Sequence, residues 1–139
     1  MLSSCSFMKQ REIKKASSEI LTSEIQETLL KEQRSVVQGK NNRGKTFAQY
    51  VLDHTLIEIS EIKEVTETDY LLEAKIHTIN PEVRQIVLEI LAPMDQATSN
   101  AFNFSEGLGR IHLAKPNLSI EVDQSLSLEV HNKDGHWVR

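Results

Sequence analysis

The sequence predicts an α+β fold in which N-terminal helices pack on a curved antiparallel sheet of about five to six strands. Apolar residues recur at three- and four-residue steps early in the chain, the period of a helix, and alternate with polar residues in several later segments, the period of a strand. Of the 139 residues, 39% are hydrophobic and 26% are charged, a balance typical of a soluble globular domain with its own core. We expect residues 12–139 to form one domain and residues 1–11 a short tether.

The first helical pattern covers residues 12–38. Its apolar positions are Ile13, Ala16, Ile20, Leu21, Ile25, Leu29 and Val36. The stripe drifts around the helix after Leu21, and Ser23 with Gln26 resembles a capping box, so the pattern also allows two helices with a break near Thr22. Gly39 is a plausible C-cap.

A short helix and a hairpin follow. Thr46 can act as the N-cap of a helix whose apolar residues are Phe47, Tyr50, Val51 and Leu52. Residues 57–65 and 70–77 then alternate between apolar and polar, with one phase slip near Glu61 that suggests a bulge. The polar turn 66–69 between them predicts an antiparallel hairpin with one buried face.

A second clear helix begins at Asn80-Pro81, which combines an N-cap residue with proline in the first helical position. Pro93 ends it. Its apolar residues form one continuous face, made of Val83, Ile86, Val87, Ile90 and Leu91. Residues 94–109 carry a weaker pattern, in which Phe102, Phe104 and Leu108 are the expected core anchors.

The C-terminal region predicts further strands at residues 110–114, 118–122 and 126–131. Asp134-Gly135 is a strong signal for a two-residue hairpin turn that leads into residues 136–138.

Leu2-Ser3-Ser4-Cys5 has the form of a lipobox, in which an aliphatic residue and two small residues precede a cysteine that is lipidated. Cys5 is the only cysteine of the chain. A lipobox functions after a charged and an apolar leader segment, so this interpretation places the true start upstream of Met1. By resemblance to bacterial lipoproteins, Cys5 is the lipid attachment site, and Ser6 in place of aspartate favours the outer membrane. The alternative is a free cysteine in the N-terminal tail of a cytoplasmic protein.

The C-terminal residues carry a second resemblance. Leu126-Ser127-Leu128-Glu129-Val130 followed by Asp134-Gly135-His136-Trp137-Val138 is similar to the ending of many small lipoprotein domains. The order of elements resembles the cone-shaped nuclear transport factor 2-like and cystatin-like folds. This resemblance implies a curved sheet with helices packed inside it and a hollow between them.

Gly39 to Thr46 matches the P-loop pattern G-x-x-x-x-G-K-[ST], whose glycines, lysine and hydroxyl hold a nucleotide and Mg²⁺. A P-loop follows a buried parallel strand, whereas a helical pattern precedes this segment and no convincing Walker B strand is present. The favoured interpretation is a basic loop between helices.

The sequence predicts no catalytic residues, no cofactor and no metal site. His77 and His131 fall on the polar faces of their strands, and His131 with His136 lacks a third ligand. Asp53 and His54 are neighbours in a helix and diverge. His112 or Asp95 in an apolar pocket would instead favour a small hydrolase or isomerase. Trp137 is expected at the edge of the sheet core.

These observations lead to one preferred function. The net charge of −4 lacks the basic surface of a nucleic-acid-binding protein. The chain is expected to be a non-enzymatic lipoprotein of the bacterial cell envelope, lipid-anchored and facing the periplasm, that binds an envelope protein or a small apolar ligand. A homodimer through the exposed sheet face is plausible. The alternatives are a small cone-fold hydrolase or isomerase and a nucleotide-binding protein.

Overall fold

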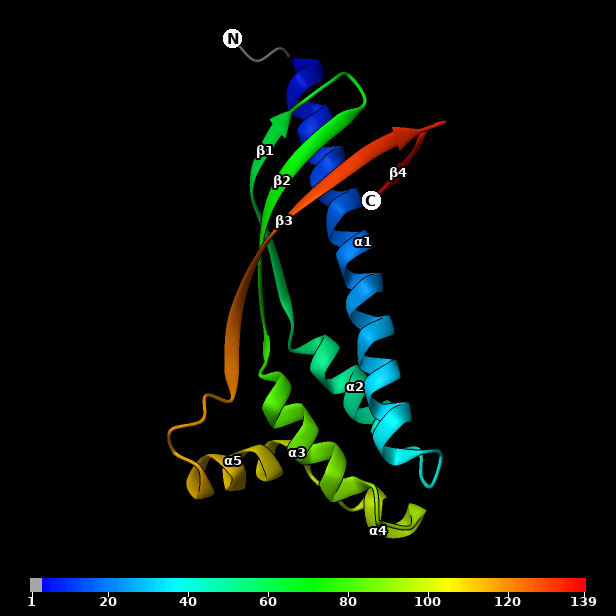
Figure 1. Cartoon of the computed structure of the whole chain (residues 1–139), viewed down its shortest axis with the longest axis vertical. Helices are drawn as coiled ribbons and strands as arrows, with labels where there is room; N and C mark the ends of the chain where they lie inside the picture. The colour runs from blue at the N-terminus through cyan, green and yellow to red at the C-terminus, as the bar shows by residue number, and fades with distance from the viewer. Residues whose placement is uncertain (1–3) are drawn as a thin grey trace. The chain divides into compact units, whose positions relative to one another are not determined.

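The computed structural model describes residues 4–139, with side chains from Met8 onward (Figure 1). In chain order its elements are α1 Ser4–Val37, α2 Arg43–Asp53, β1 Leu56–Glu64, β2 Asp69–Ile79, α3 Pro81–Leu91, α4 Gln96–Asn100, α5 Phe104–Ala114, β3 Glu121–Lys133 and β4 His136–Val138. The predicted α+β class is confirmed. The chain divides into two compact units, which we call the sheet unit (residues up to Glu24, 56–76 and 123–139) and the helical unit (residues 25–55 and 77–122).

Helix α1 is continuous from Ser4 to Val37, so of the two interpretations that the pattern allowed, the one with a break near Thr22 is wrong. Its buried residues follow one another at four-residue steps: Ile13, Ser17, Leu21, Leu29, Gln33 and Val37, with Ile25 half-buried in the same series. Four residues are slightly more than one turn, so the buried stripe advances by about 40° at each step. That rotation explains the drift in the pattern. Thr22 donates its hydroxyl to the Ser18 carbonyl at 2.7 Å, as threonines inside helices do.

Helix α1 begins at Ser4, so residues 4–11 are helical where the sequence suggested a short tether. The lipobox falls outside the described residues: Leu2 and Ser3 are not described, and of Ser4 and Cys5 only the helical backbone is. None of the helices within residues 4–139 combines the length and the apolar character needed to span a bilayer.

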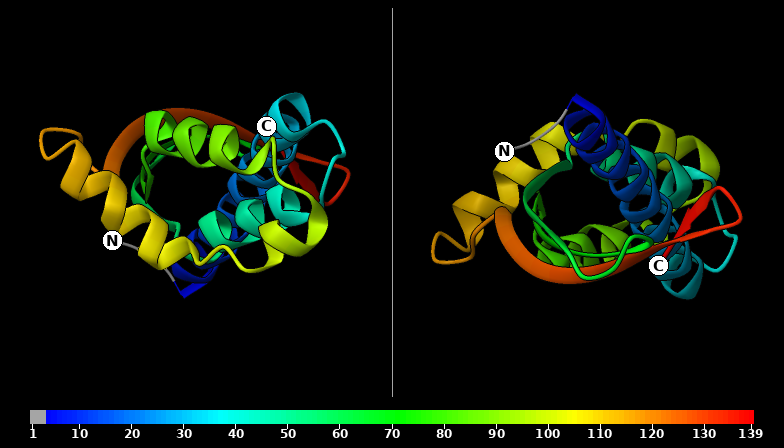
Figure 2. Two further views of the ribbon diagram at one scale, coloured as in Figure 1. Left: turned by 90° about the horizontal axis from the view of Figure 1, so that it is seen from below. Right: turned by 90° about the horizontal axis from the view of Figure 1, so that it is seen from above.

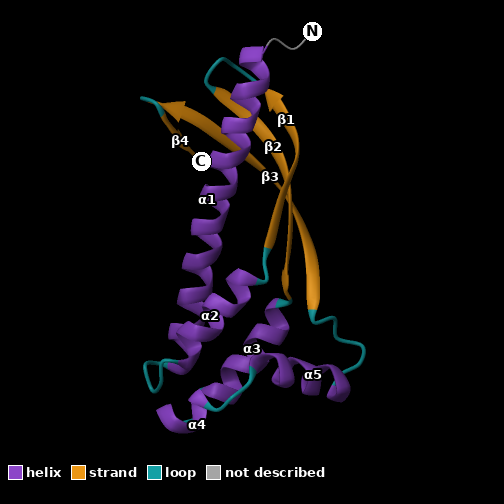
Figure 3. Ribbon diagram, turned by 180° about the vertical axis from the view of Figure 1, so that it is seen from behind, coloured by secondary structure: helices purple, strands orange, loops and turns teal. Residues whose placement is uncertain are grey.

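Within residues 4–139 the sheet holds four antiparallel strands in the order β1-β2-β3-β4, fewer than the predicted five to six (Figure 3). Residues 110–114 belong to helix α5, so that predicted strand is wrong. The predicted strand 126–131 lies within the longer strand β3, which also includes the last two residues of the predicted strand 118–122. The alternating residues Ile111 and Leu113 resemble a strand, and Gly107 and Gly109 lower the helical propensity just before them. The hairpin of β1 and β2 is confirmed.

The sheet unit has one core between the sheet and the first part of α1. Its buried members are Ile13, Leu21, Tyr70, Leu72, Ala74, Leu128 and Val130. Asp134 and Gly135 both have positive φ, at 53° and 85°, and bring His136 opposite Lys133. This confirms the predicted hairpin turn, since such turns need two residues in the left-handed region. Trp137 is half-buried at this core, where its ring meets Tyr70 edge-on at 5.7 Å.

The helical unit packs α2, α3, α5 and the second part of α1 around a larger core. Its buried members are Leu29, Val37, Phe47, Ala48, Val51, Ile79, Val83, Val87, Leu88, Leu91, Phe104, Leu108 and Ile111. Phe104 and Leu108 are therefore core anchors as predicted, whereas Phe102 is half-buried against this core. The chain runs from α3 through the short α4 into α5 (Figure 2).

Local sequence signals explain how α3 begins. Asn80 accepts a hydrogen bond from the Glu82 amide at 3.0 Å, and Pro81 is the first residue of the helix, as predicted. Helix α2 differs from expectation, because it begins at Arg43 after Asn42 and not at Thr46. Thr46 lies inside the helix and donates its hydroxyl to the Asn42 carbonyl at 3.3 Å.

Candidate functional site

An apolar groove of about 450 Å³ lies in the helical unit between α3 and α5. We call it the α3–α5 groove. Its walls are Ile86, Ile90, Met94, Phe102, Gly107, Arg110, Ile111, Ala114 and Lys115. A concave, mainly apolar site of this volume with a few polar groups has the size and character of a small-molecule site. The sequence suggested a hollow between sheet and helices instead.

The groove exists because α3 has more apolar surface than the core covers. Val83, Val87 and Leu91 point into the core, as the predicted face requires. Ile86 is only half-buried and Ile90 is 37% exposed, although the sequence placed both on the same buried face. These two isoleucines line the α3 side of the groove. Partly exposed apolar side chains that gather in a concave surface are typical of a site that binds a ligand.

The α5 side is a single helical stripe. Gly107, Arg110, Ile111 and Ala114 stand at positions i, i+3, i+4 and i+7, and Lys115 follows at the helix end. The sequence interpretation missed this stripe because it assigned residues 110–114 to a strand. The apolar spacing of residues 104, 108 and 111 was the available signal for a helix.

Gly107 allows the Phe102 ring to close one end of this stripe. A Cβ atom at residue 107 would lie 2.5 Å from Cζ of Phe102, closer than real contacts allow. Arg43 donates from Nη2 to the Phe102 carbonyl at 2.7 Å, and its guanidinium lies over the Phe104 ring at 4.3 Å. The backbone that carries Phe102 is thereby tied to α2.

The two cations at the groove differ in their partners. Arg110 donates to Glu106 at 2.7 Å on the exposed surface of α5. The Lys115 side chain makes no hydrogen bond or ion pair with any residue of the described chain. Lys115 is thus the positive charge that an anionic group in the groove would meet.

The P-loop-like segment has a different geometry from a nucleotide site. Helix α1 precedes it, and the chain turns through Gln38 and Gly39, both with positive φ, directly into α2. Asn41 is buried, and its amide donates to the Leu91 and Met94 carbonyls at 3.0 Å each. The strand that precedes a P-loop is replaced by α1, as the favoured interpretation expects.

Gly44, the second glycine of that match, serves helix packing. A Cβ atom there would lie 2.6 Å from Oε1 of Gln33 and 2.9 Å from the Val37 side chain. Helices α1 and α2 approach closely at this point because residue 44 has no side chain.

Two histidines, His77 and His131, pair with carboxylates across strands on the polar face of the sheet. His131 bonds Asp69 at 2.6 Å and His77 bonds Glu121 at 3.1 Å, which agrees with the predicted polar faces. His136 stands opposite Lys133 and not opposite His131. Among the described residues, no group of three or more potential ligands is placed to hold a metal ion.

Asp95 and His112 would favour an enzyme if they lay in an apolar pocket, and neither of them does. Asp95 caps α4, where its carboxylate accepts from the Thr98 amide at 2.7 Å. The hydrogen bonds from Thr98 hold the pKa of Asp95 below its usual value, so it is an anionic cap. His112 is exposed on α5.

Comparison with family models, with curated proteins and with solved structures finds no match to this chain. The likeness to lipoproteins and to the cone-shaped folds therefore stays a prediction.

A second, more open groove of about 550 Å³ lies in the sheet unit between α1 and β4. Ala16, Ile20 and Trp137 share its walls with Glu19, Glu24 and other polar groups. Trp137 donates its ring N–H to Glu12 at 3.3 Å, and Arg139 forms an ion pair with Glu24. The chain's own groups thus satisfy part of this polar surface.

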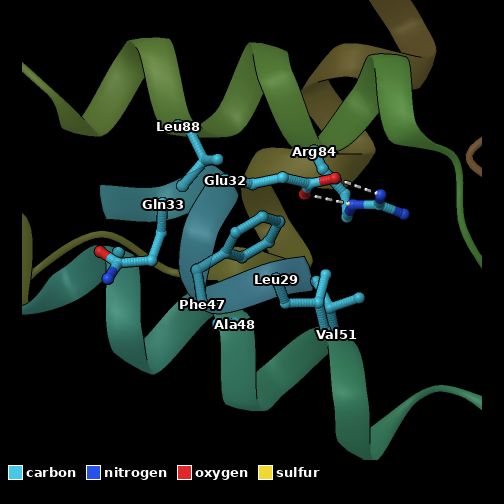
Figure 4. A pocket seen from close by; sticks show the side chains of 9 residues that line it. Leu29, Glu32, Gln33, Phe47, Ala48, Val51, Arg84 and Leu88 are labelled. Carbon is cyan, nitrogen blue, oxygen red and sulfur yellow. Dashed lines mark hydrogen bonds and ion pairs between the residues drawn. The ribbon is translucent and has the colours of Figure 1, made fainter. Parts of the chain in front are cut away.

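A buried ion pair was missed by the sequence interpretation. Arg84 of α3 donates from Nε and Nη2 to both oxygens of Glu32 in α1, at 2.9 and 2.7 Å (Figure 4). Its Nη1 donates to the Ile79 carbonyl at 2.8 Å. A cavity of about 10 Å³, the size of one water molecule, lies beside the pair. The available signal was a charged residue in register with Leu88 and Leu91 on the buried face of α3.

Proposed function

We propose that this chain is a non-enzymatic binding protein of the bacterial cell envelope, anchored by a lipid on Cys5, that binds a small apolar ligand in the α3–α5 groove. The groove is the observation that carries the binding half of this proposal. The lipobox-like Leu2-Ser3-Ser4-Cys5 carries the anchoring half. The two halves rest on different residues, so each has its own test.

Apolar contact supplies most of the affinity in this proposal. Ile86, Ile90 and Ile111 offer branched side chains on facing walls, and burial of apolar surface contributes about 25 cal/mol for each Å². The polar groups at the groove are two cations, Arg110 and Lys115. A ligand with an apolar body and one anionic group therefore complements the groove better than a neutral or cationic one.

The binding half is tested with anilinonaphthalene sulfonate, a fluorescent anion with an apolar body. We expect saturable binding to the purified protein with one site per chain. Ile90→Glu should abolish it, because the substitution puts a carboxylate into the apolar wall. Leu113→Glu is the matched control, since Leu113 is 81% exposed on α5 and lies outside the groove.

Two results would contradict the binding half. One is the absence of saturable binding, and the other is an equal loss in Ile90→Glu and Leu113→Glu. Circular dichroism of both variants should match that of the unaltered protein, because residue 90 is already 37% exposed.

The anchoring half is tested by metabolic labelling with a tagged fatty acid, with the gene expressed from its own upstream codons. We expect the label in the membrane fraction, and its loss in Cys5→Ala. Unlabelled, soluble protein would contradict the anchor and leave the binding half in place, because the groove residues lie between positions 86 and 115.

A further inference from the structure

The α3–α5 groove has two chemically different ends. The Phe102 ring lies against Gly107 near the start of α5, and Lys115 stands just after its last residue. Eight residues separate positions 107 and 115, which at 1.5 Å per residue is about 12 Å along the helix. Phe102 and Lys115 thus line the same apolar groove near opposite ends of α5.

Phe102 is suited to act as a stop because several contacts fix it. Its ring lies against Gly107, where a Cβ atom would be only 2.5 Å from Cζ. The ring also packs on Phe104 at a centroid distance of 6.0 Å, and the Phe102 carbonyl accepts from Arg43. A flexible residue in this position would yield to a longer ligand, whereas a packed aromatic ring resists displacement.

Lys115 is suited to hold the ligand's polar group. It has no hydrogen-bond or ion-pair partner for its side chain within residues 8–139, whereas Arg110 is already paired with Glu106. An exposed ion pair adds little affinity. The role of Lys115 is therefore to set the direction in which the ligand lies in the groove.

We infer that the ligand is an unbranched carboxylate of medium length, with its carboxylate at Lys115 and its terminal methyl group against Phe102. This inference rests on the proposed function and adds the ligand class to it. An extended peptide residue spans about 3.5 Å over its three backbone bonds, which is roughly 1.2 Å per bond. An extended alkyl chain advances by a similar length per bond. A span of about 12 Å therefore holds roughly ten carbons.

The test is a calorimetric titration of the full chain with straight-chain carboxylates from six to sixteen carbons, each below its micelle concentration. Up to about ten carbons, each added CH₂ should tighten binding by up to about fourfold, the transfer value for one methylene. Beyond that length the affinity should stop rising. Phe102→Ala should move this limit to longer chains, and Phe102→Leu should move it less.

The orientation has its own measurement. The ten-carbon carboxylate should bind up to about fivefold more tightly than the ten-carbon alcohol, the range for an exposed ion pair. Lys115→Gln should bring this ratio towards one, because it weakens binding of the carboxylate more than binding of the alcohol. Lys45→Gln is the control, because it removes the same charge from an exposed position of the helical unit outside the groove. An equal effect of both substitutions would contradict the assigned orientation.

The failure of this inference can be told apart from the failure of the proposed function. The inference alone would be overturned by two results together. Anilinonaphthalene sulfonate would bind saturably, and the affinity for carboxylates would keep rising to sixteen carbons in both the unaltered protein and Phe102→Ala. Absence of binding by both the sulfonate and every carboxylate would overturn both.

Discussion

The ion pair that joins two helices of the helical unit lies in a different environment from a pair that joins two strands of the sheet unit. In the helical unit, Arg84 and Glu32 form a bidentate pair whose side chains are 10% and 31% exposed. In the sheet unit, Lys75 and Asp123 pair at 3.7 Å with both side chains about half exposed, at 53% and 51%. Charges within a protein interact more strongly than charges in water, and they cost more when left unpaired. The same chemistry is therefore expected to be essential in one unit and dispensable in the other.

The two units also differ in the composition of their surfaces. The polar face of the sheet satisfies its charges by pairing them across strands, as in Asp69–His131 and Lys75–Asp123. The helical unit holds the Arg84–Glu32 pair between α1 and α3, and it gathers Ile86 and Ile90 in the wall of the α3–α5 groove. Exposed apolar side chains also occur in the sheet unit, as at Leu56 and Val65, but those of α3 line a concave apolar groove, the kind of surface that suits a small ligand.

The largest effect is expected from removing the buried cation. Arg84→Ala leaves the Glu32 carboxylate partly buried without a partner and the Ile79 carbonyl without its donor. We expect a loss of about 2–4 kcal/mol in the free energy of unfolding, somewhat below the range for fully buried pairs because Glu32 is 31% exposed. Urea denaturation followed by circular dichroism measures this loss.

Two further variants sharpen that result. Lys75→Ala in the sheet unit should cost less than about 1 kcal/mol, as exposed pairs do. Glu32→Leu combined with Arg84→Met should recover most of the loss, because an apolar pair of similar volume replaces the charges. Equal losses for Arg84→Ala and Lys75→Ala would show that burial does not distinguish the two pairs.

The sequence predicted elements well where local signals were sufficient. Asn80-Pro81 began α3, and Asp134-Gly135 formed the terminal turn, because each motif acts within a few residues. The errors lie where distant contacts decide the outcome. The rotating stripe of α1 resembled a helix with a break, because its drift comes from contacts along the whole helix. Residues 110–114 resembled a strand because Ile111 and Leu113 alternate with polar residues, although the spacing of residues 104, 108 and 111 is helical.

The candidate site was the least predictable part for the same reason. The residues of the groove were mostly recognised as apolar, yet all five apolar positions of α3 were expected in the core. How many of them the core can cover depends on how α5 crosses α3, which no local pattern records. The pairing of Glu32 with Arg84 joins residues 52 positions apart.

A smaller effect is expected from two glycines of the helical unit. Gly44→Ala should destabilise the protein by about 1–3 kcal/mol, because the new Cβ atom would meet Gln33 and Val37 in a packed interface. Gly109→Ala is the matched variant in α5, where the new Cβ atom meets nothing within 4 Å. It should stabilise the protein by about 0.5–1 kcal/mol through helix propensity alone.

Thermal unfolding of both glycine variants tests this difference in sign. If Gly44→Ala were stabilising like Gly109→Ala, the close approach of α1 and α2 at residue 44 would be wrong. The interface between α1 and α2 would then be loosely packed at residue 44. The helical unit would differ less from the exposed face of the sheet.

The smallest effect is expected in the sheet unit, as a dependence of stability on pH. The hydrogen bond with His131, and after it that with Thr66, holds the pKa of Asp69 below its usual value of 3.8. A carboxylate with a lowered pKa in the folded state stabilises the fold above its unfolded pKa, and that contribution is lost as pH falls through the lower folded value. Asp69→Asn should therefore lower the melting temperature slightly at pH 5–7, and the difference from the unaltered protein should shrink below about pH 3.8.

His131→Ala provides the coupling test for that prediction. It removes the group that contributes most to the lowered pKa of Asp69, so Asp69→Asn should have little further effect in its presence. A melting-temperature difference for Asp69→Asn that stays constant from pH 7 to pH 2.5 would contradict the assignment. It would show that the contribution of Asp69 to stability does not depend on its charge.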